Sequence, residues 1–140
     1  MSSLAPATPR KPRPEYRNIH VTQIVGYRMP VPALVSIMHR VSGALLFLAL
    51  PLLLWMLDLS LISEGTYARL AQLGSGVFVR LVLLVLIWSF LHHLVAGIRY
   101  LVLDLHVGLE LQQARRNAVA VYLVSLPLTL VAALKLFGVF

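Results

Sequence analysis

Cysteine is absent from this sequence of 140 residues. Its absence excludes disulfides, iron–sulfur clusters and zinc–thiolate sites on the chain. Charged residues are scarce as well, at 12% of the sequence, against about 25% in soluble domains. Hydrophobic residues reach 59%, which is more apolar surface than one soluble core of this size can bury. The composition therefore indicates an integral membrane protein.

Acidic residues are few: five Asp and Glu stand against twelve Lys and Arg, which gives a formal net charge of +7. The basic residues gather at the ends of apolar runs, where they act as topology signals. They form no patch interleaved with aromatic residues of the kind that binds nucleic acid. Repeats, glycine-rich phosphate loops and nucleophile–base pairs are also missing. We therefore expect contact with membrane lipid, no nucleic-acid partner and no catalytic residue on this chain.

Three apolar runs, at about residues 32–59, 78–103 and 118–138, predict an all-α membrane protein with three transmembrane helices. The charge-free core of the first run is Val41–Leu57, and with the preceding turns it exceeds the roughly 20 residues needed to cross a bilayer. The second run has a charge-free core at Leu81–Ile98. A short surface helix is expected at Thr66–Gly76 between them. Residues 17–140 are treated as one three-helix membrane domain.

The third run shows no chemistry beyond packing. Pro127 is expected to kink this helix, because proline removes one backbone hydrogen bond. Ser125 and Thr129 lie close to it in sequence and are expected to satisfy the carbonyl groups that the proline frees.

The chain begins with a basic, proline-rich arm at residues 1–16, whose composition predicts disorder. The arm has no apolar segment of the secretory type, and its prolines disfavour the amphipathic helix of a mitochondrial transit peptide. Tyr16–Met29 reads as a short interfacial segment. The arm and the second loop, with Arg115 and Arg116, carry most of the positive charge, so the N-terminus is expected in the cytoplasm and the C-terminus outside.

A polar stripe runs along the second apolar segment. At helical spacing, one face carries an imidazole, small residues one turn later and polar groups toward the end: Ser89, His93, Ala96, Gly97, Tyr100 and Asp104. An imidazole with a missing side chain four residues away suits a flat, bulky cofactor. Alternatively, Ala96 and Gly97 admit another helix, and the stripe is a polar helix contact. The stripe by itself leaves both interpretations open.

A second polar face lies at the entry of the first segment, where Ser36, His39, Arg40 and Gly43 share one side of a helix. These donors could bind a carbonyl oxygen or a carboxylate. Alternatively, Arg40 extends to the membrane surface and His39 hydrogen-bonds another helix. In the expected topology His39 and His93 lie roughly 12 and 16 Å from the same side. This shared depth favours a cofactor site between the two segments.

The two motifs Ser36-Ile37-Met38-His39-Arg40-Val41-Ser42-Gly43 and His93-x-x-x-Gly97-Ile98-Arg99-Tyr100-x-x-x-Asp104 resemble the cytochrome b membrane-anchor subunit of succinate dehydrogenase. The resemblance covers Arg17 to Phe140, and the two motifs together are specific. It implies a complex with a flavoprotein subunit, an iron–sulfur subunit and a second small membrane anchor. It further implies haem b shared with that second anchor, ubiquinone as substrate, and a multi-pass location in the bacterial inner membrane, the mitochondrial inner membrane being the less favoured alternative.

By motif position, the resemblance implies that His93 is the axial haem ligand from this chain, the other ligand coming from the partner anchor. His39 and Arg40 would contact the haem propionates, and Ser36 and Arg40 would line the quinone pocket. Gly97, Tyr100 and Asp104 would be further contacts along the stripe. Tyr100 departs from the pattern, because relatives often carry histidine there.

Rival assignments remain open from the sequence. His92 could replace His93 as the ligand, although it lies about 100° round the helix and is expected to contact a neighbouring helix. His39 could form an intrachain ligand pair with His93. Arg99 and Asp104 could simply mark the cytoplasmic boundary. The two remaining histidines, at positions 20 and 106, lie in surface segments and are expected to be solvated.

Rival functions remain open too. The chain could be the anchor of a quinol:fumarate reductase, which runs the same chemistry backwards. It could be a non-enzymatic three-span structural or assembly subunit, whose polar stripes are helix contacts. It could also be a small carrier or channel subunit that uses His93 and Arg40 in a proton or anion path.

Overall fold

The computed structural model describes residues 20, 22 and 26–139. The arm at residues 1–16 lies outside the described residues, as does most of the segment Tyr16–Met29. Within the described part the chain is helical and has no strand. The four helices are α2 (Val31–Ile62), α3 (Glu64–Gly74), α4 (Val77–Asp104) and α5 (Leu111–Leu136). Helices α2, α4 and α5 are long and apolar enough to cross a membrane, so the predicted all-α membrane fold with three spans is confirmed.

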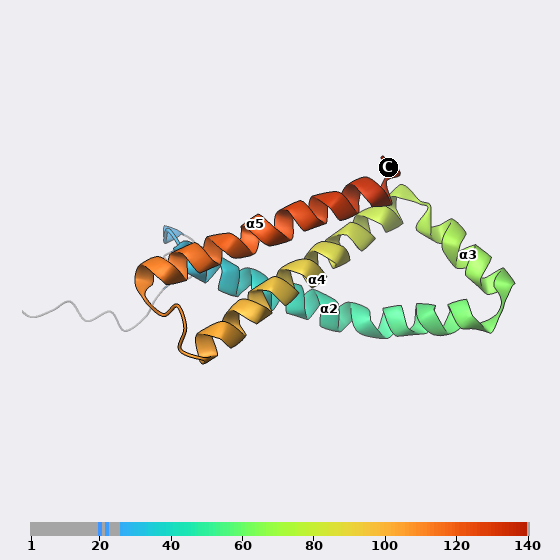
Figure 1. The fold of residues 1–140 in the computed structure, drawn as a ribbon. Coiled ribbons are helices and arrows are strands. Elements are labelled where there is room, and N and C mark those ends of the chain that lie inside the picture. The colour runs from blue at the N-terminus through green and yellow to red at the C-terminus, as the bar shows by residue number, and fades with distance from the viewer. Residues whose placement is uncertain (1–19, 21, 23–25, 140) are drawn as a thin grey trace, which may run out of the picture.

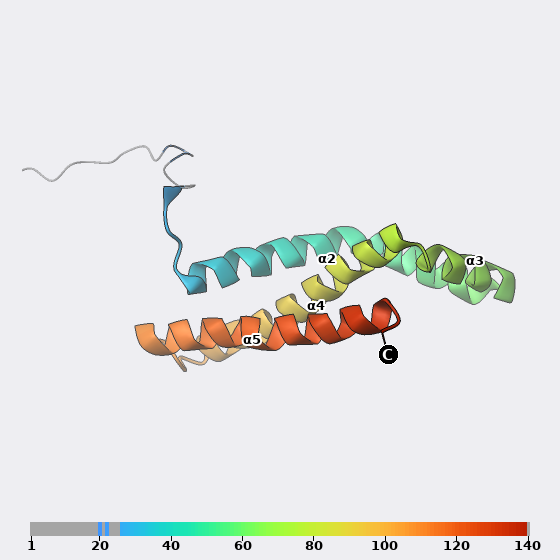
Figure 2. The ribbon, with the colours of Figure 1, turned by 90° about the horizontal axis from the view of Figure 1, so that it is seen from above.

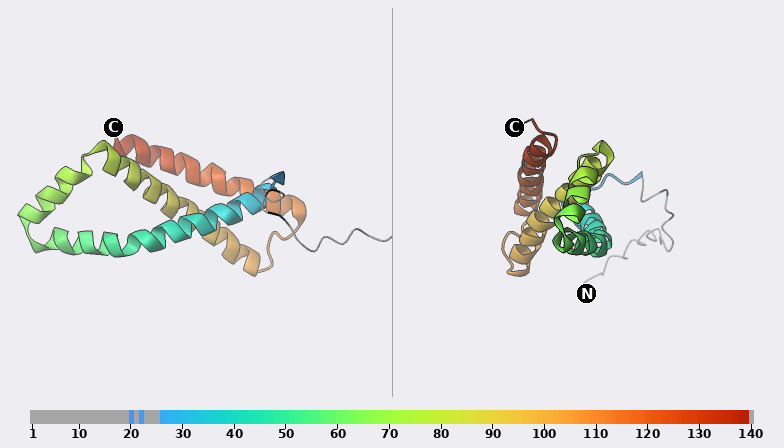
Figure 3. Two further views of the ribbon diagram at one scale, coloured as in Figure 1. Left: turned by 180° about the vertical axis from the view of Figure 1, so that it is seen from behind. Right: turned by 90° about the vertical axis from the view of Figure 1, so that its right-hand side faces the viewer.

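Helix α4 lies between the other two long helices and packs against both (Figures 1 and 2). It crosses α2 near the middle of the bundle, and α3 joins α2 to α4 at one end. The view along the bundle in Figure 3 shows α2 and α5 on different sides of α4. The fully buried apolar core is small: Val35, Ala96, Ala118 and Val121. Because α4 has two partner helices, its side chains face two different interfaces.

The outer surfaces of the long helices are strongly apolar. Phe47 and Leu48 on α2 are 75% and 73% exposed, and Leu123 on α5 is 68% exposed. Apolar patches of this extent do not face water in soluble proteins. They are the expected outer surface of helices that lie in lipid or against other membrane helices.

The surface helix begins two residues earlier than predicted because of its cap. The Ser63 hydroxyl accepts a hydrogen bond from the Thr66 backbone N–H, and the Thr66 hydroxyl accepts one from the Ser63 N–H. This reciprocal capping box satisfies two donors that a helix start leaves free. Helix α3 therefore starts at Glu64 and ends at Gly74.

Helix α5 begins at Leu111, well before the predicted start near residue 118. The added residues are mainly glutamine, alanine and arginine, all good helix formers, so the helix continues beyond the apolar run. It also continues through Pro127. Thr129 donates to the Ser125 carbonyl at 2.7 Å, but the carbonyl four residues before Pro127 belongs to Leu123. The expectation that Ser125 and Thr129 replace the missing hydrogen bond is therefore not met.

Candidate functional site

Two histidines meet where α2 crosses α4. The His39 ring from α2 stacks on the His93 ring from α4, with 4.1 Å between ring centroids and 8° between ring planes. These residues lie 54 positions apart in the sequence. The two polar faces that the sequence placed at a similar depth are thus in direct contact.

Hydrogen bonds hold the His93 ring in one orientation. Its Nδ1 lies 3.0 Å from the His39 carbonyl oxygen and 3.4 Å from Ser42 Oγ. The carbonyl can only accept, so we assign the proton to Nδ1 as the donor. The Ser42 hydroxyl donates to the same carbonyl at 2.9 Å. His93 Nε2 is then left with a lone pair, and it makes no hydrogen bond to a described residue. This is the arrangement found in metal-ligating histidines, whose second nitrogen is held by a carbonyl or carboxylate.

A glycine in each helix lies beside the stacked pair, but only one of them is required for the pair to fit. A Cβ on Gly43 would lie 2.8 Å from His93 Cε1, closer than real Cβ contacts allow. A Cβ on Gly97 would lie 3.6 Å from His39 Nε2, an ordinary van der Waals distance. Gly43 therefore makes the room that the His93 ring occupies, whereas Gly97 only flanks His39.

Tyr100 extends the cluster toward the end of α4. Its ring lies 5.1 Å from the His39 ring at a tilt of 53°. Its hydroxyl is buried without a hydrogen-bond partner in the described part of the chain. A buried phenol normally finds a partner, so this hydroxyl is an exception within the described part of the chain.

Three other expected site residues lie apart from this cluster. Ser36 is half-buried and Arg40 exposed on α2, and neither makes a hydrogen bond or ion pair within the described residues. Asp104 is the exposed last residue of α4, about 16 Å along the helix from His93. The structure therefore brings His39, His93 and Tyr100 together, and it leaves Arg40 and Asp104 available to other molecules.

His92 faces the opposite interface. It is fully buried, and its Nδ1 lies 3.4 Å from Ser125 Oγ on α5. The rings of Trp88 and Tyr122 lie 5.5 Å from the His92 ring. His92 thus contacts a neighbouring helix, as expected. The sequence analysis missed the two α5 contacts, although Tyr122 and Ser125 are spaced three residues apart and so share a helix face.

The sequence left open that Arg99 simply marks the cytoplasmic boundary, and the structure buries it to 9% exposure. Its Nη2 lies 3.5 Å from the Ala114 carbonyl, and its guanidinium lies 5.2 Å from the Tyr100 ring centroid. The early start of α5 explains this burial, because the first turns of that helix cover Arg99. His20 and His106 are exposed, as expected.

The donor set within the chain is suited to a cofactor rather than to a bare metal ion. The described residues contain no group of three or more His, Cys, Asp or Glu side chains that could hold a metal. A haem brings four nitrogen ligands of its own and needs only axial ligands from protein. One oriented imidazole at the α2–α4 crossing meets that requirement.

The helices and this site define a class: a three-span helical membrane protein with an oriented histidine inside the bundle. Comparison with known sequences gives the family. The family described as "Succinate dehydrogenase/Fumarate reductase transmembrane subunit" matches residues 10–132, and the chain belongs to it. The resemblance inferred from the two motifs is thereby confirmed.

Curated relatives agree with this assignment. The succinate dehydrogenase cytochrome b556 subunit of Paracoccus denitrificans is 31% identical over 111 residues, which cover 79% of this chain and 85% of the relative. The subunit of the same name from Coxiella burnetii is 35% identical over 101 residues, covering 71% and 80%. That of Rickettsia prowazekii is 30% identical over 104 residues, covering 74% and 81%. Membership of a succinate dehydrogenase complex follows from the family.

Proposed function

We propose that this chain is the cytochrome b anchor of a succinate:ubiquinone oxidoreductase, and that it binds haem b and helps to form the site of ubiquinone reduction. The observation that carries the proposal is the orientation of His93. Its Nδ1 is held by the His39 carbonyl, which leaves Nε2 free for iron. The relatives' names, all succinate dehydrogenase cytochrome b556 subunits, support haem b and favour succinate oxidation over fumarate reduction.

His93 would be the axial ligand from this chain, and the second ligand would come from the partner anchor. An intrachain pair with His39 is disfavoured by geometry. The two rings lie face to face at 4.1 Å, so their nitrogens lie in parallel planes and do not converge on one iron between them. His39 and Arg40 would instead hold the propionates, since Arg40 is exposed and lacks an acidic partner among the described residues. When bound, haem b supplies a centre that stores one electron.

Ser36 and Arg40 would line the quinone pocket. A quinone that is reduced gains two electrons and two protons, so its oxygens become negative before protonation. The Ser36 hydroxyl can donate to such an oxygen, and the guanidinium of Arg40 stabilises developing negative charge. Both residues are free of hydrogen bonds to the rest of the described chain, so neither must break a bond to act. The iron–sulfur subunit would close this pocket and deliver electrons, and the flavoprotein subunit would oxidise succinate.

The positive-inside distribution supports a cytoplasmic N-terminus and a location in the bacterial inner membrane. The N-terminal end of α2, with Ser36 and His39, would then lie in the cytoplasmic half of the bilayer. That is the side on which the iron–sulfur and flavoprotein subunits would attach.

The haem assignment is tested by His93→Ala in the complex, with reduced-minus-oxidised spectra as the measurement. We expect loss or strong disturbance of the b-type signal, because iron loses one axial ligand. His92→Gln is the matched control: it alters the adjacent histidine but keeps a polar group near Ser125, and its signal should persist. A normal spectrum in His93→Ala, or loss of the signal only in His92→Gln, would contradict the assignment.

The quinone assignment is tested separately with Ser36→Ala and Arg40→Ala. We expect ubiquinone reduction to fall about 100- to 1,000-fold, the range for removing one donor that stabilises developing charge. Succinate oxidation with a soluble dye should persist, because the dye accepts electrons before the membrane site. Equal loss of both activities would indicate failed assembly, and retention of both would remove these residues from the pocket.

A further inference from the structure

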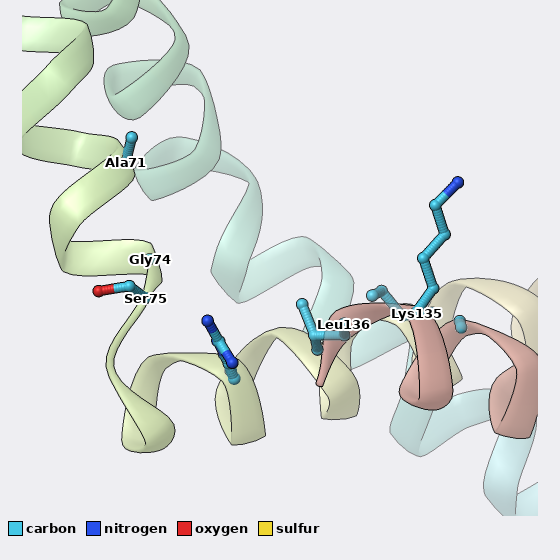
Figure 4. A pocket seen from close by; sticks show the side chains of 8 residues that line it. Ala71, Gly74, Ser75, Lys135 and Leu136 are labelled. Atoms are coloured by element: carbon cyan, nitrogen blue, oxygen red, sulfur yellow. The ribbon is translucent and has the colours of Figure 1, made fainter. Parts of the chain in front are cut away.

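A cavity of about 560 Å³ lies at the end of the bundle far from the His39–His93 pair, where α3, α4 and α5 meet. Figure 4 shows Gly74 and Ser75 at the end of α3 on one side, and Lys135 and Leu136 at the end of α5 on the other. Its lining includes two cations, Arg80 near the start of α4 and Lys135 in the last turn of α5. The proposed haem and quinone sites use none of these residues.

This cationic cavity continues into an apolar one. A second cavity of about 520 Å³ shares Ile87, Ala132 and Lys135 with the first. Apart from Lys135, its lining is entirely apolar, from leucines of α2 through Phe90 of α4 to Val131 of α5. A charged mouth that opens into an apolar interior matches an amphiphile with a charged head.

The charge at the mouth is uncompensated within the described part of the chain. Neither Arg80 nor Lys135 makes an ion pair there, and no Asp or Glu lines either cavity. The negative end of the α5 dipole stabilises the positive charge of Lys135. Arg80 lies at the start of α4, where the positive end of the helix dipole destabilises its charge. Two unpaired cations that line one cavity favour the binding of an anion.

The two cavities also have the depth profile of a lipid. Arg80 lies about 5 Å along α4 from its first residue, Val77, at the level of a helix end. From Arg80 the apolar lining of α4 reaches Leu91, about 16 Å deeper. Arg80 therefore lies at the edge of the apolar span of α4, where lipid phosphates would be expected, and the apolar cavity lies within that span.

We infer that these two cavities form a binding site for one anionic phospholipid, with its phosphate at the mouth that Arg80 and Lys135 line and an acyl chain in the apolar cavity between α2, α4 and α5. A quinone would fit the apolar part, but its neutral head needs hydrogen-bond donors rather than two permanent charges. A helix of a partner subunit would need acidic side chains at the mouth to pair the two cations. Basic pockets between membrane helices bind anionic lipid headgroups on the cytoplasmic side of membranes, and we apply the same chemistry to this pocket at the outer end of the bundle.

The test uses the intact complex, purified in detergent and titrated with phosphatidylglycerol or phosphatidylcholine of equal chain length, with native mass spectrometry as the readout. The variant is Arg80→Gln with Lys135→Gln. We expect its affinity for phosphatidylglycerol to fall on the order of 30-fold, as for loss of two charges near a membrane surface. Arg69→Gln is the matched control, because Arg69 is exposed on α3 and lines neither cavity.

Ala132→Phe adds a test that keeps both charges. Ala132 lines both cavities, so the larger side chain should exclude the acyl chain and also lower phosphatidylglycerol binding. Equal binding of the two lipids by the wild type, or unchanged binding in the charge variant, would overturn the inference. The inference would also be overturned if these variants lost co-purified quinone or a partner subunit while their phosphatidylglycerol binding stayed unchanged. The outcome is independent of haem content, which the same samples report through their b-type spectra.

Discussion

Two adjacent histidines on one helix have opposite environments. His92 is fully buried between α4 and α5, with Ser125, Trp88 and Tyr122 around its ring. His93 lies half-buried at the crossing of α4 with α2 and stacks on His39. One step along a helix turns a side chain by about 100°, and α4 has a different neighbour on each side. The difference between the two residues is therefore set by the position of the partner helices.

The comparison separates a structural interface from one suited to a cofactor. The His92 ring is fully buried, with the rings of Trp88 and Tyr122 at 5.5 Å and its Nε2 without a hydrogen-bond partner among the described residues. At the α2–α4 crossing one nitrogen of His93 is held by a backbone carbonyl and the other is free. Polar residues within a membrane are retained either as contacts between helices or as parts of functional sites, and under the proposed function α4 carries one of each.

Gly43→Ala is the one substitution expected to change both the stability of the complex and its spectrum. The new Cβ would lie 2.8 Å from His93 Cε1, so the ring must shift or the helices must separate. Overpacking of this kind costs about 1–3 kcal/mol, and a shift of the ring would weaken its bond to the His39 carbonyl. We expect a lower thermal midpoint of the purified complex and less b-type absorbance per complex.

Gly97→Ala is the control for that change. Its Cβ would meet His39 Nε2 at 3.6 Å, an ordinary contact, and alanine gains about 0.5–1 kcal/mol over glycine in a helix. The thermal midpoint should therefore remain close to that of the wild type, and a changed spectrum at that midpoint would support the stripe contact that the resemblance implies for Gly97. Equal effects of the two substitutions would mean that the close approach at Gly43 does not position His93.

His92→Ala is expected to act on stability without acting on the spectrum. Removing a fully buried ring leaves a cavity between α4 and α5, at a cost of about 2–4 kcal/mol by analogy with other large-to-alanine changes in cores. The thermal midpoint should fall, and the complex that remains folded should keep its b-type signal. A lost signal at an unchanged midpoint would make His92 the ligand and would reverse the comparison.

Most of the fold was predictable because, in a membrane, the length of an apolar run largely determines whether it forms a spanning helix. A helix must supply all its own backbone hydrogen bonds in lipid, so a long apolar run has one solution. The ends were less predictable, since α5 begins at Leu111 among residues that are polar yet favour helix. Hydropathy predicts the part of a helix that lies in lipid, whereas the polar residues that continue the helix beyond that part are recognised only by their helix propensity.

The site was predictable to the extent that it follows from helix periodicity and depth. His39 and His93 were expected at a common level, and the structure places their rings in contact. The surroundings of His92 and Arg99 were not predictable in the same way. Both depend on which side of α4 is covered by α5, and a single sequence does not record the order of helices around a bundle. Arg99 is buried because the early first turns of α5 cover it, and the predicted start of that helix did not include those turns.

The smallest effect is expected from Ser125→Ala, which tests whether the bond to His92 or the packing of its ring holds α5 to α4. The two side chains are 3.4 Å apart, a long hydrogen bond, and bonds between membrane helices contribute about 0.6 kcal/mol on average. We therefore expect a fall in the thermal midpoint that is a fraction of the His92→Ala effect. Thr129→Val is the control, because the Thr129 hydroxyl bonds within α5 and its loss leaves the interface intact. If Ser125→Ala were as damaging as His92→Ala, the interface would depend on the hydrogen bond, and the enclosing rings of Trp88 and Tyr122 would contribute little to it.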